Sequence, residues 1–168
     1  MILKNASVFL QNRFEICDVA VENGKIAAIG PDLGPGEDCT GLRLLPGLVD
    51  IHTHGAMGED FSDGKIEGMQ AMADYYAAHG VTSYLATTMT LKEEVLTPAM
   101  HAIRDFKREG GAKCAGIHLE GPFLGYAKRG AQAADNLHKP DIALFDRLNA
   151  ASGGMVKQIG RASCRERV

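Results

Sequence analysis

The sequence has little or nothing of several features that define common protein classes. It holds four cysteines in 168 residues, none of them in a Cys-x-x-Cys pair, which argues against a disulfide framework or a structural zinc site. No apolar run approaches the roughly 18 residues of a membrane span, and the apolar N-terminal stretch lacks the small-residue cleavage site of a signal peptide. The net charge of −3 gives no general attraction to nucleic acid or to an anionic membrane. We therefore predict a cytoplasmic globular protein with reduced thiols, which binds neither nucleic acid nor membrane.

A Gly-x-Gly-x-x-Gly motif after the first strand is also missing, which disfavours a dinucleotide-binding sheet. What the sequence does contain is an alternation of strands and helices at intervals of about thirty residues, typical of a parallel α/β sheet. Apolar and β-branched runs predict strands at 41–55, 81–89, 112–121 and 155–159. Helical spacing predicts helices at 65–80, at 91–111 with a kink or restart at Pro98, and at 140–154. A complete (β/α)8 TIM barrel takes about 250 residues, so we predict its first three to four strands only.

The residues before this alternation have a different pattern, that of short strands. Asn23-Gly24 between two β-rich runs is a strong hairpin signal, and four glycines and two prolines make residues 30–41 a turn-rich connector. We predict a partial β-sandwich domain at 1–45 and a partial barrel at 46–159. The last nine residues carry three arginines and no periodicity, so we predict a non-native tail at 160–168.

The first motif with chemical content is Pro-Gly-Leu-Val-Asp-Ile-His-Thr-His-Gly at 46–55. Side chains alternate along a strand, so His52 and His54 are expected to point the same way. At the carboxyl end of a barrel strand that direction is the mouth, where catalytic groups of this fold lie. Two imidazoles so placed can bind one divalent ion. The alternative is a chance pair on a half-exposed strand, which the Pro-Gly before it and Gly55 after it disfavour.

The second motif is Gly-Ile-His-Leu-Glu-Gly-Pro-Phe at 116–123. A carboxylate at the tip of an apolar strand is costly unless it is paired or bound to a cation, so Glu120 is the best metal-ligand candidate. His118 is expected one layer deeper, as a residue that orients a ligand, with a satisfied core histidine as the equal alternative. A divalent ion such as zinc, iron or manganese suits these ligands, and metal-dependent hydrolysis is the predicted reaction class.

At these two motifs the sequence resembles the amidohydrolase superfamily, and within it the N-acetylglucosamine-6-phosphate deacetylases. The similarity extends over residues 1–159 and includes Gly-Val-Thr-Ser-Tyr-Leu-Ala-Thr-Thr-Met-Thr at 80–90 and Lys-Arg-Gly-Ala-Gln at 128–132. The resemblance implies hydrolysis of the N-acetyl group of N-acetylglucosamine 6-phosphate to glucosamine 6-phosphate and acetate, in amino-sugar catabolism.

The resemblance also implies roles for single residues. Glu120 matches the carboxylate that binds the principal metal, and His52 and His54 match a pair that binds a second metal in some members. Ala131 and Gln132 match a loop that touches substrate, although the family often has histidine at the position of Gln132. The catalytic aspartate is expected beyond residue 159, so no catalytic residue is predicted within this chain, and a homodimer is expected for the full-length protein.

Two other interpretations stay open from the sequence. One is a different amidohydrolase, dihydroorotase-like or dipeptidase-like, which the setting of Glu120 disfavours because many of those enzymes use a bridging lysine. The other is a non-catalytic, truncated product. We expect the 168-residue chain to be inactive even if its gene encodes an enzyme.

Overall fold

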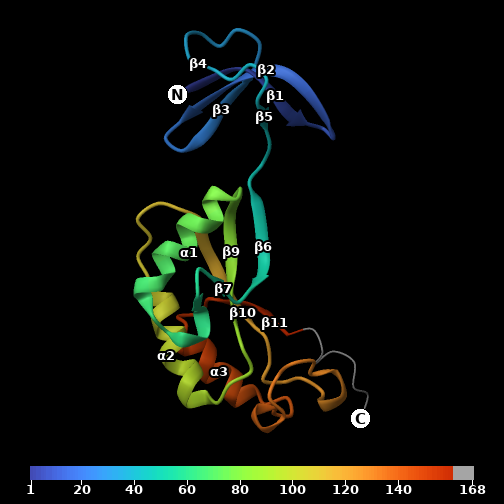
Figure 1. The fold of residues 1–168 in the computed structure, drawn as a ribbon, viewed down its shortest axis with the longest axis vertical. Helices are drawn as coiled ribbons and strands as arrows, with labels where there is room; N and C mark the ends of the chain where they lie inside the picture. The colour runs from blue at the N-terminus through green and yellow to red at the C-terminus, as the bar shows by residue number, and fades with distance from the viewer. Residues whose placement is uncertain (161–168) are drawn as a thin grey trace. The chain divides into compact units, whose positions relative to one another are not determined.

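The structure is a computed structural model that describes residues 1–160. It divides into two compact units, Met1–Pro46 and the part from Gly47 onward, and each is described by itself (Figure 1). The predicted tail lies outside the described residues except for Gly160. None of the helices in residues 1–160 combines the length and the apolar character that crossing a membrane demands.

The first unit is a five-stranded sheet. Its strands are β1 Ile2–Leu10, β2 Arg13–Glu22, β3 Lys25–Gly30, β4 Glu37–Asp38 and β5 Arg43–Leu44. They lie in the order β3-β2-β1-β4, with β5 also paired to β1, and only β4 and β5 run parallel to β1. The predicted hairpin joins β2 to β3, because Asn23 and Gly24 adopt the positive φ values of 49° and 72° that a tight hairpin turn requires.

A small core and one buried carboxylate hold this sheet together. The core side chains are Ala6, Val8, Val19 and Cys39. Asp18 is 3% exposed and accepts hydrogen bonds from the backbone N–H groups of Asn5 (2.9 Å) and Leu33 (3.1 Å) and from the Lys4 ammonium (3.2 Å). Asn5 has a φ of 57°, and the β1–β2 register shifts between Leu3 and Ala6, so Asp18 satisfies the backbone where the ladder is interrupted.

The second unit alternates strand and helix as the sequence predicts. Its main elements are β6 Leu48–Thr53, α1 Ile66–Ala78, β9 Val81–Thr88, α2 Glu93–Asp105, β10 Lys113–Leu119, α3 Ile142–Ala151 and β11 Val156–Ile159. The four strands form a parallel sheet in the order β11-β10-β9-β6. Neighbours in sequence are therefore neighbours in the sheet (Figure 1), which is the connectivity of consecutive β/α units.

The prediction for the second helix was wrong at its C-terminal end. α2 is continuous through Pro98 but ends at Asp105, and Phe106 is no longer helical, with a ψ of 121°. Beyond that point the backbone bonds to α1: Glu109 N–H donates to Gln70 Oε1 (2.9 Å) and Ala112 N–H donates to the Ala73 carbonyl (2.8 Å). These tertiary bonds compete with the helical ones that the residues after Asp105 would otherwise make. Gly110 and Gly111, both at positive φ, turn the chain after the helix has already ended.

One hydrophobic core joins the helices to the sheet. Residues from α1, α2, α3 and the central strands contribute to it, among them Met69, Met72, Tyr84, Leu96, Met100, Ile117 and Leu148. This core includes Ile117 and Leu119 of β10, the strand that Glu120 follows. The edge strand β6 exposes Leu48, Val49 and Ile51, each more than half accessible.

Candidate metal centre

His52 and His54 lie at the carboxyl end of β6, where the strand is irregular. Between Asp50 and Thr53 the chain advances three residues on β6 against two on β9, from Tyr84 to Ala86, which is the signature of a β-bulge. Side chains replace the missing ladder acceptors: His52 N–H donates to Asp50 Oδ1 (2.9 Å) and Thr53 N–H donates to Thr87 Oγ1 (3.0 Å). The bulge re-aims the strand end that carries the two histidines.

Gly55 ends this segment at a place where no side chain fits. It begins the short strand β7 Gly55–Ala56, which pairs with β8 Glu59–Asp60. A Cβ on Gly55 would lie 2.0 Å from the Glu59 carbonyl oxygen. The glycine is therefore required for the close approach of the β7–β8 turn, directly after His54.

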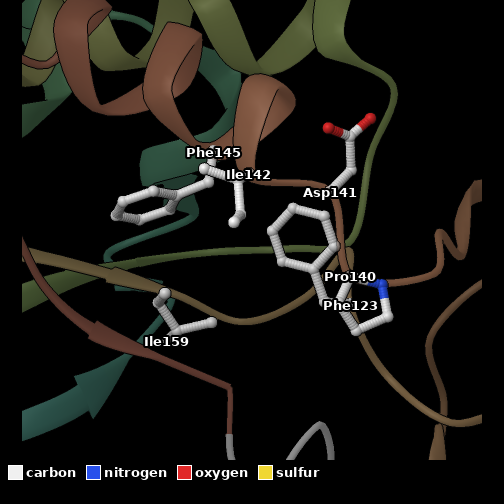
Figure 2. Close-up of a pocket in the computed structure, with 6 residues that line it drawn as sticks. All are labelled: Phe123, Pro140, Asp141, Ile142, Phe145 and Ile159. Atoms are coloured by element: carbon white, nitrogen blue, oxygen red, sulfur yellow. The ribbon is translucent and has the colours of Figure 1, made fainter.

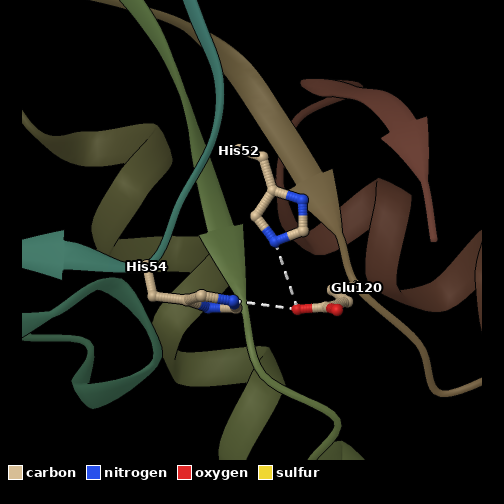
Figure 3. Close-up of side chains that lie close together, drawn as sticks. All are labelled: His52, His54 and Glu120. Carbon is tan, nitrogen blue, oxygen red and sulfur yellow. Dashed lines mark ion pairs between the residues drawn. The ribbon is translucent and has the colours of Figure 1, made fainter. Parts of the chain in front are cut away.

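Glu120 follows the last residue of β10, and its carboxylate meets both imidazoles. Its Oε2 lies 2.8 Å from His54 Nε2 and 3.4 Å from His52 Nε2. Figure 3 shows the two rings converging on this oxygen from β6 while Glu120 approaches from the end of β10. The side chains are 31%, 48% and 24% exposed for His54, His52 and Glu120, so the group is open to solvent.

The three residues have the spacing and the chemistry of a divalent-metal site. One ligand atom of each lies within 4.8 Å of the others, and no other such group of three is found within residues 1–160. Two ligand atoms about 2.1 Å from one tetrahedral ion are about 3.4 Å apart, which matches the His52–Glu120 distance. The shorter His54–Glu120 distance is that of a hydrogen bond, which an ion would replace. Two imidazole nitrogens and a carboxylate oxygen therefore fit a zinc-type ion.

His118 lies beneath this group and is 2% exposed. Its Nδ1 is 3.1 Å from the Ile51 carbonyl oxygen; because a carbonyl only accepts, Nδ1 carries the proton. Burial, and secondarily the charge of His52, lowers the pKa of His118, which favours the neutral ring. Its ring meets that of His52 edge-on with centroids 4.7 Å apart. His118 thus contacts both the backbone before His52 and the His52 ring, and lies outside the group of three.

Ala131 and Gln132, the two loop residues predicted to touch substrate, differ in how far they are exposed to solvent. Ala131 is exposed, whereas Gln132 is 7% exposed. Gln132 Oε1 accepts a hydrogen bond from Thr90 N–H (2.9 Å), and its Nε2 lies 3.9 Å from Met89 Sδ. Both ends of this amide are therefore occupied by the segment after β9, a connection for which the sequence gives no signal.

An apolar pocket in the second unit shares no residue with the histidine–glutamate group. It has a volume of about 340 Å³ and is lined by Phe123, Pro140, Asp141, Ile142, Phe145 and Ile159 (Figure 2). Its one charged group, the Asp141 carboxylate, accepts a hydrogen bond from Leu144 N–H and so caps α3. This pocket has no set of converging polar groups.

The second unit has the fold of consecutive β/α units, with a candidate divalent-metal centre at the ends of two strands. Comparisons with known proteins show what the chain is similar to. No protein-family profile matched the chain. It is 34% identical over 95% of its length to N-acetylglucosamine-6-phosphate deacetylase of Lysinibacillus sphaericus, of which it covers 43%. It is 30% identical over 87% of its length to N-acetylgalactosamine-6-phosphate deacetylase of Escherichia coli O157:H7, of which it covers 39%.

Solved structures give the same result. Over 95% of the chain the fold matches a mutant N-acetylglucosamine-6-phosphate deacetylase of Mycobacterium smegmatis in complex with N-acetyl-D-glucosamine 6-phosphate. The TM-score is 0.84 at 26% identity, and the match covers 42% of that protein. The predicted α/β fold and the predicted resemblance to N-acetylglucosamine-6-phosphate deacetylases are confirmed, and the chain spans less than half the length of these relatives.

Proposed function

We propose that this chain is part of a metal-dependent deacetylase that hydrolyses the N-acetyl group of N-acetylglucosamine 6-phosphate. The observation that carries the proposal is the convergence of His52, His54 and Glu120 at the ends of two parallel strands. The similarity to proteins named for this reaction supports it. Glucosamine 6-phosphate and acetate would be the products.

His52, His54 and Glu120 would hold the divalent ion through the two Nε2 atoms and the carboxylate. A bound ion of this type polarises a carbonyl and lowers the pKa of water. The protein's own contribution is orientation: the β6 bulge sets the two rings, and we propose that His118 keeps them in place. His118 does so by donating to the Ile51 carbonyl and by packing against the His52 ring.

Ala131 is proposed to touch the substrate through its backbone, since it is exposed beside the anchored Gln132. Gln132 itself would act on the substrate indirectly, by holding the loop, unless its bond to Thr90 N–H breaks. The general acid/base that amide hydrolysis needs is proposed to be an aspartate outside this chain. We therefore expect the 168-residue chain alone to release no measurable acetate.

A sugar phosphate is charged and is retained by the membrane of the cell that makes it, which supports a cytoplasmic location. The homodimer expected from the resemblance remains part of the proposal. Zinc, iron and manganese all suit the ligands.

The test is turnover by the protein that the whole gene encodes. We expect acetate release from N-acetylglucosamine 6-phosphate, abolition by a chelator and restoration by a divalent ion. N-acetylgalactosamine 6-phosphate, the C4 epimer, is the matched second substrate, because one relative is named for it. Faster turnover of the epimer would move the proposal to that sugar. Hydrolysis of a cyclic amide or a dipeptide, with none of either sugar, would refute it.

A further inference from the structure

Thr90 lies two residues beyond the end of β9, is 1% exposed, and uses all of its polar groups. Its Oγ1 donates to the backbone carbonyl of Glu120 (2.9 Å). Its N–H donates to Gln132 Oε1 (2.9 Å), and its carbonyl accepts from Asn136 Nδ2 (3.1 Å). One residue thus bonds to the carboxylate member of the candidate metal centre and, twice, to the loop that carries Ala131 and Gln132.

The contact between Thr90 and Glu120 depends on the next residue being glycine. Gly121 adopts a φ of 81°, and a Cβ there would lie 2.1 Å from Thr90 Oγ1. Any side chain at 121 would expel the hydroxyl from the Glu120 carbonyl. The backbone of Glu120 is therefore fixed by a specific, partly buried hydrogen bond immediately where β10 ends.

The loop side of the connection is equally specific. Gln132 lies two residues before the short 3-10 helix η3 Ala134–Asn136, and Asn136 is its last residue. Their side chains turn inward to the two backbone groups of Thr90. Inward-turned amides that satisfy a buried backbone are costly to remove, because the backbone groups would be left without partners. The loop is anchored at Thr90 by both.

We infer that Thr90 is a positioning residue that couples the orientation of Glu120 to the position of the loop at residues 125–136. This rests on the proposed function, in that Glu120 is taken as a metal ligand. The Thr90 hydroxyl fixes the Glu120 backbone, while the Thr90 backbone fixes the loop. Cation binding at Glu120 should therefore change the mobility of the loop at residues 125–136. Loss of the Thr90 hydroxyl should weaken both cation binding and this effect on the loop.

The chain offers a matched control two residues earlier. Thr88 is 0% exposed, and its hydroxyl has no partner within residues 1–160. Thr88→Val and Thr90→Val are thus the same chemical change, at neighbouring buried positions on the same segment. Only the second removes a hydrogen bond to Glu120. Thr90→Ser keeps the hydroxyl and serves as the rescue variant.

The first measurement is a titration of the 168-residue chain with cobalt(II), followed by its visible absorption, with metal-free thermal melts to verify folding. We expect Thr90→Val to weaken binding by about tenfold, Thr90→Ser to stay near wild type, and Thr88→Val to change it less than twofold. Wild-type affinity in Thr90→Val, or an equal loss in Thr88→Val, would overturn the inference. So would a loss in Thr90→Ser as large as in Thr90→Val.

The second measurement reads the loop directly by limited proteolysis. Trypsin cleaves after Lys128 and Arg129, both within the loop, and mass spectrometry assigns the fragments. We expect cobalt(II) to slow these cleavages in the wild type and in Thr88→Val but much less in Thr90→Val. An equal effect of the ion in all three, or none in the wild type, would exclude the coupling. This readout is insensitive to a uniform loss of stability, because each variant is compared with itself.

Failure of the two proposals would look different. If the wild type and Glu120→Gln bind cobalt(II) equally weakly, the metal centre itself is refuted. If Glu120→Gln abolishes binding and Thr90→Val leaves it unchanged, the metal centre stands and only the role of Thr90 falls.

Discussion

Each unit has a carboxylate that lies among its strands, Asp18 in the first and Glu120 in the second. The two carboxylates differ in their exposure and in their hydrogen-bond partners. Asp18 in the first unit is 3% exposed and accepts from two backbone N–H groups and one ammonium. Glu120 in the second unit has a side chain that is 24% exposed and faces two imidazole nitrogens. The hydrogen-bond donors to Asp18 belong to the folded backbone and to Lys4. At Glu120, by contrast, a bound ion could replace the direct contacts between the carboxylate and the two imidazoles.

The difference separates a structural carboxylate from a functional one. The Asn5 N–H hydrogen bond, followed by that from Leu33 N–H and the contact with Lys4, lowers the pKa of Asp18. A carboxylate stabilised in this way contributes to folding and is of no use to a ligand. Glu120 keeps an open side, and its neighbours are both good metal ligands. A substitution at Glu120 should therefore weaken cation binding and leave stability unchanged, whereas a substitution at Asp18 should do the reverse.

The largest effect is expected for Glu120→Gln on cation binding. The amide keeps the shape but loses the charge, and we expect the affinity of the chain for cobalt(II) to fall by at least about 100-fold. The metal-free thermal stability should hardly change, since the pair is partly exposed. Glu94→Gln, at a side chain that is 75% exposed, is the matched control and should bind as the wild type does. Unchanged affinity in Glu120→Gln would contradict the assignment.

Asp18→Asn should give the converse result. The amide presents an NH2 group where one of the three donors now points, so the first unit should open more readily. We expect protection of β1 and β2 amides in hydrogen exchange to fall by about tenfold, with cation binding unaffected. Asp32→Asn is the control, because Asp32 is 95% exposed and only 3.7 Å from the same Lys4. Equal loss of protection in both variants would show that the charge near Lys4 matters more than the hydrogen bonds.

The acid side of the stability curve should show the same carboxylate. Because the folded pKa of Asp18 is lowered, its contribution is fully present above the unfolded value of about 3.9 and is lost as pH falls through the folded value. The first unit should therefore lose protection below about pH 4. Asp38, whose pKa is lowered chiefly by the Thr40 hydroxyl, acts in the same direction. Asp18→Asn should flatten this dependence, and the double variant with Asp38→Asn should flatten it further; an unchanged slope would refute the assignment.

The sequence predicts the fold of the second unit well because its signals are local. The strand and helix periods and the positions of His52, His54 and Glu120 at strand ends can be read from neighbouring residues, as can the Asn23-Gly24 turn of the first unit. What sequence could not predict depends on register between distant segments. One example is the bulge before Thr53, which depends on the shift in register between β6 and β9.

The same reason explains the other differences. The Gln132 side chain reaches a segment 42 residues away, a contact that no local pattern in the sequence predicts. Thr90 has nothing in its local sequence to distinguish it from Thr87 or Thr88. The end of α2 is set by bonds to α1, which outweigh the helix preference of residues 106–109. In each case a hydrogen bond to a distant segment replaces one that local sequence would predict, and such bonds are known only from the folded structure.

The smallest effect should come from a polar group that has neither the donors of Asp18 nor the open side of Glu120. Tyr84 is fully buried between Phe61 and Tyr76, its hydroxyl has no partner within residues 1–160, and burial raises its pKa. Removing an oxygen without a hydrogen bond costs little, so Tyr84→Phe should change the free energy of unfolding by less than about 1 kcal/mol or stabilise the chain.

Tyr76→Phe is the matched comparison, because the Tyr76 hydroxyl lies 2.9 Å from Thr53 Oγ1. It should cost about 1 kcal/mol in urea denaturation, since Thr53 loses a partner. If Tyr84→Phe instead proves the more destabilising of the two, its hydroxyl has a bound partner such as water. It would then be wrong that the hydrogen bonds of a buried polar group, rather than its burial, decide what its removal costs.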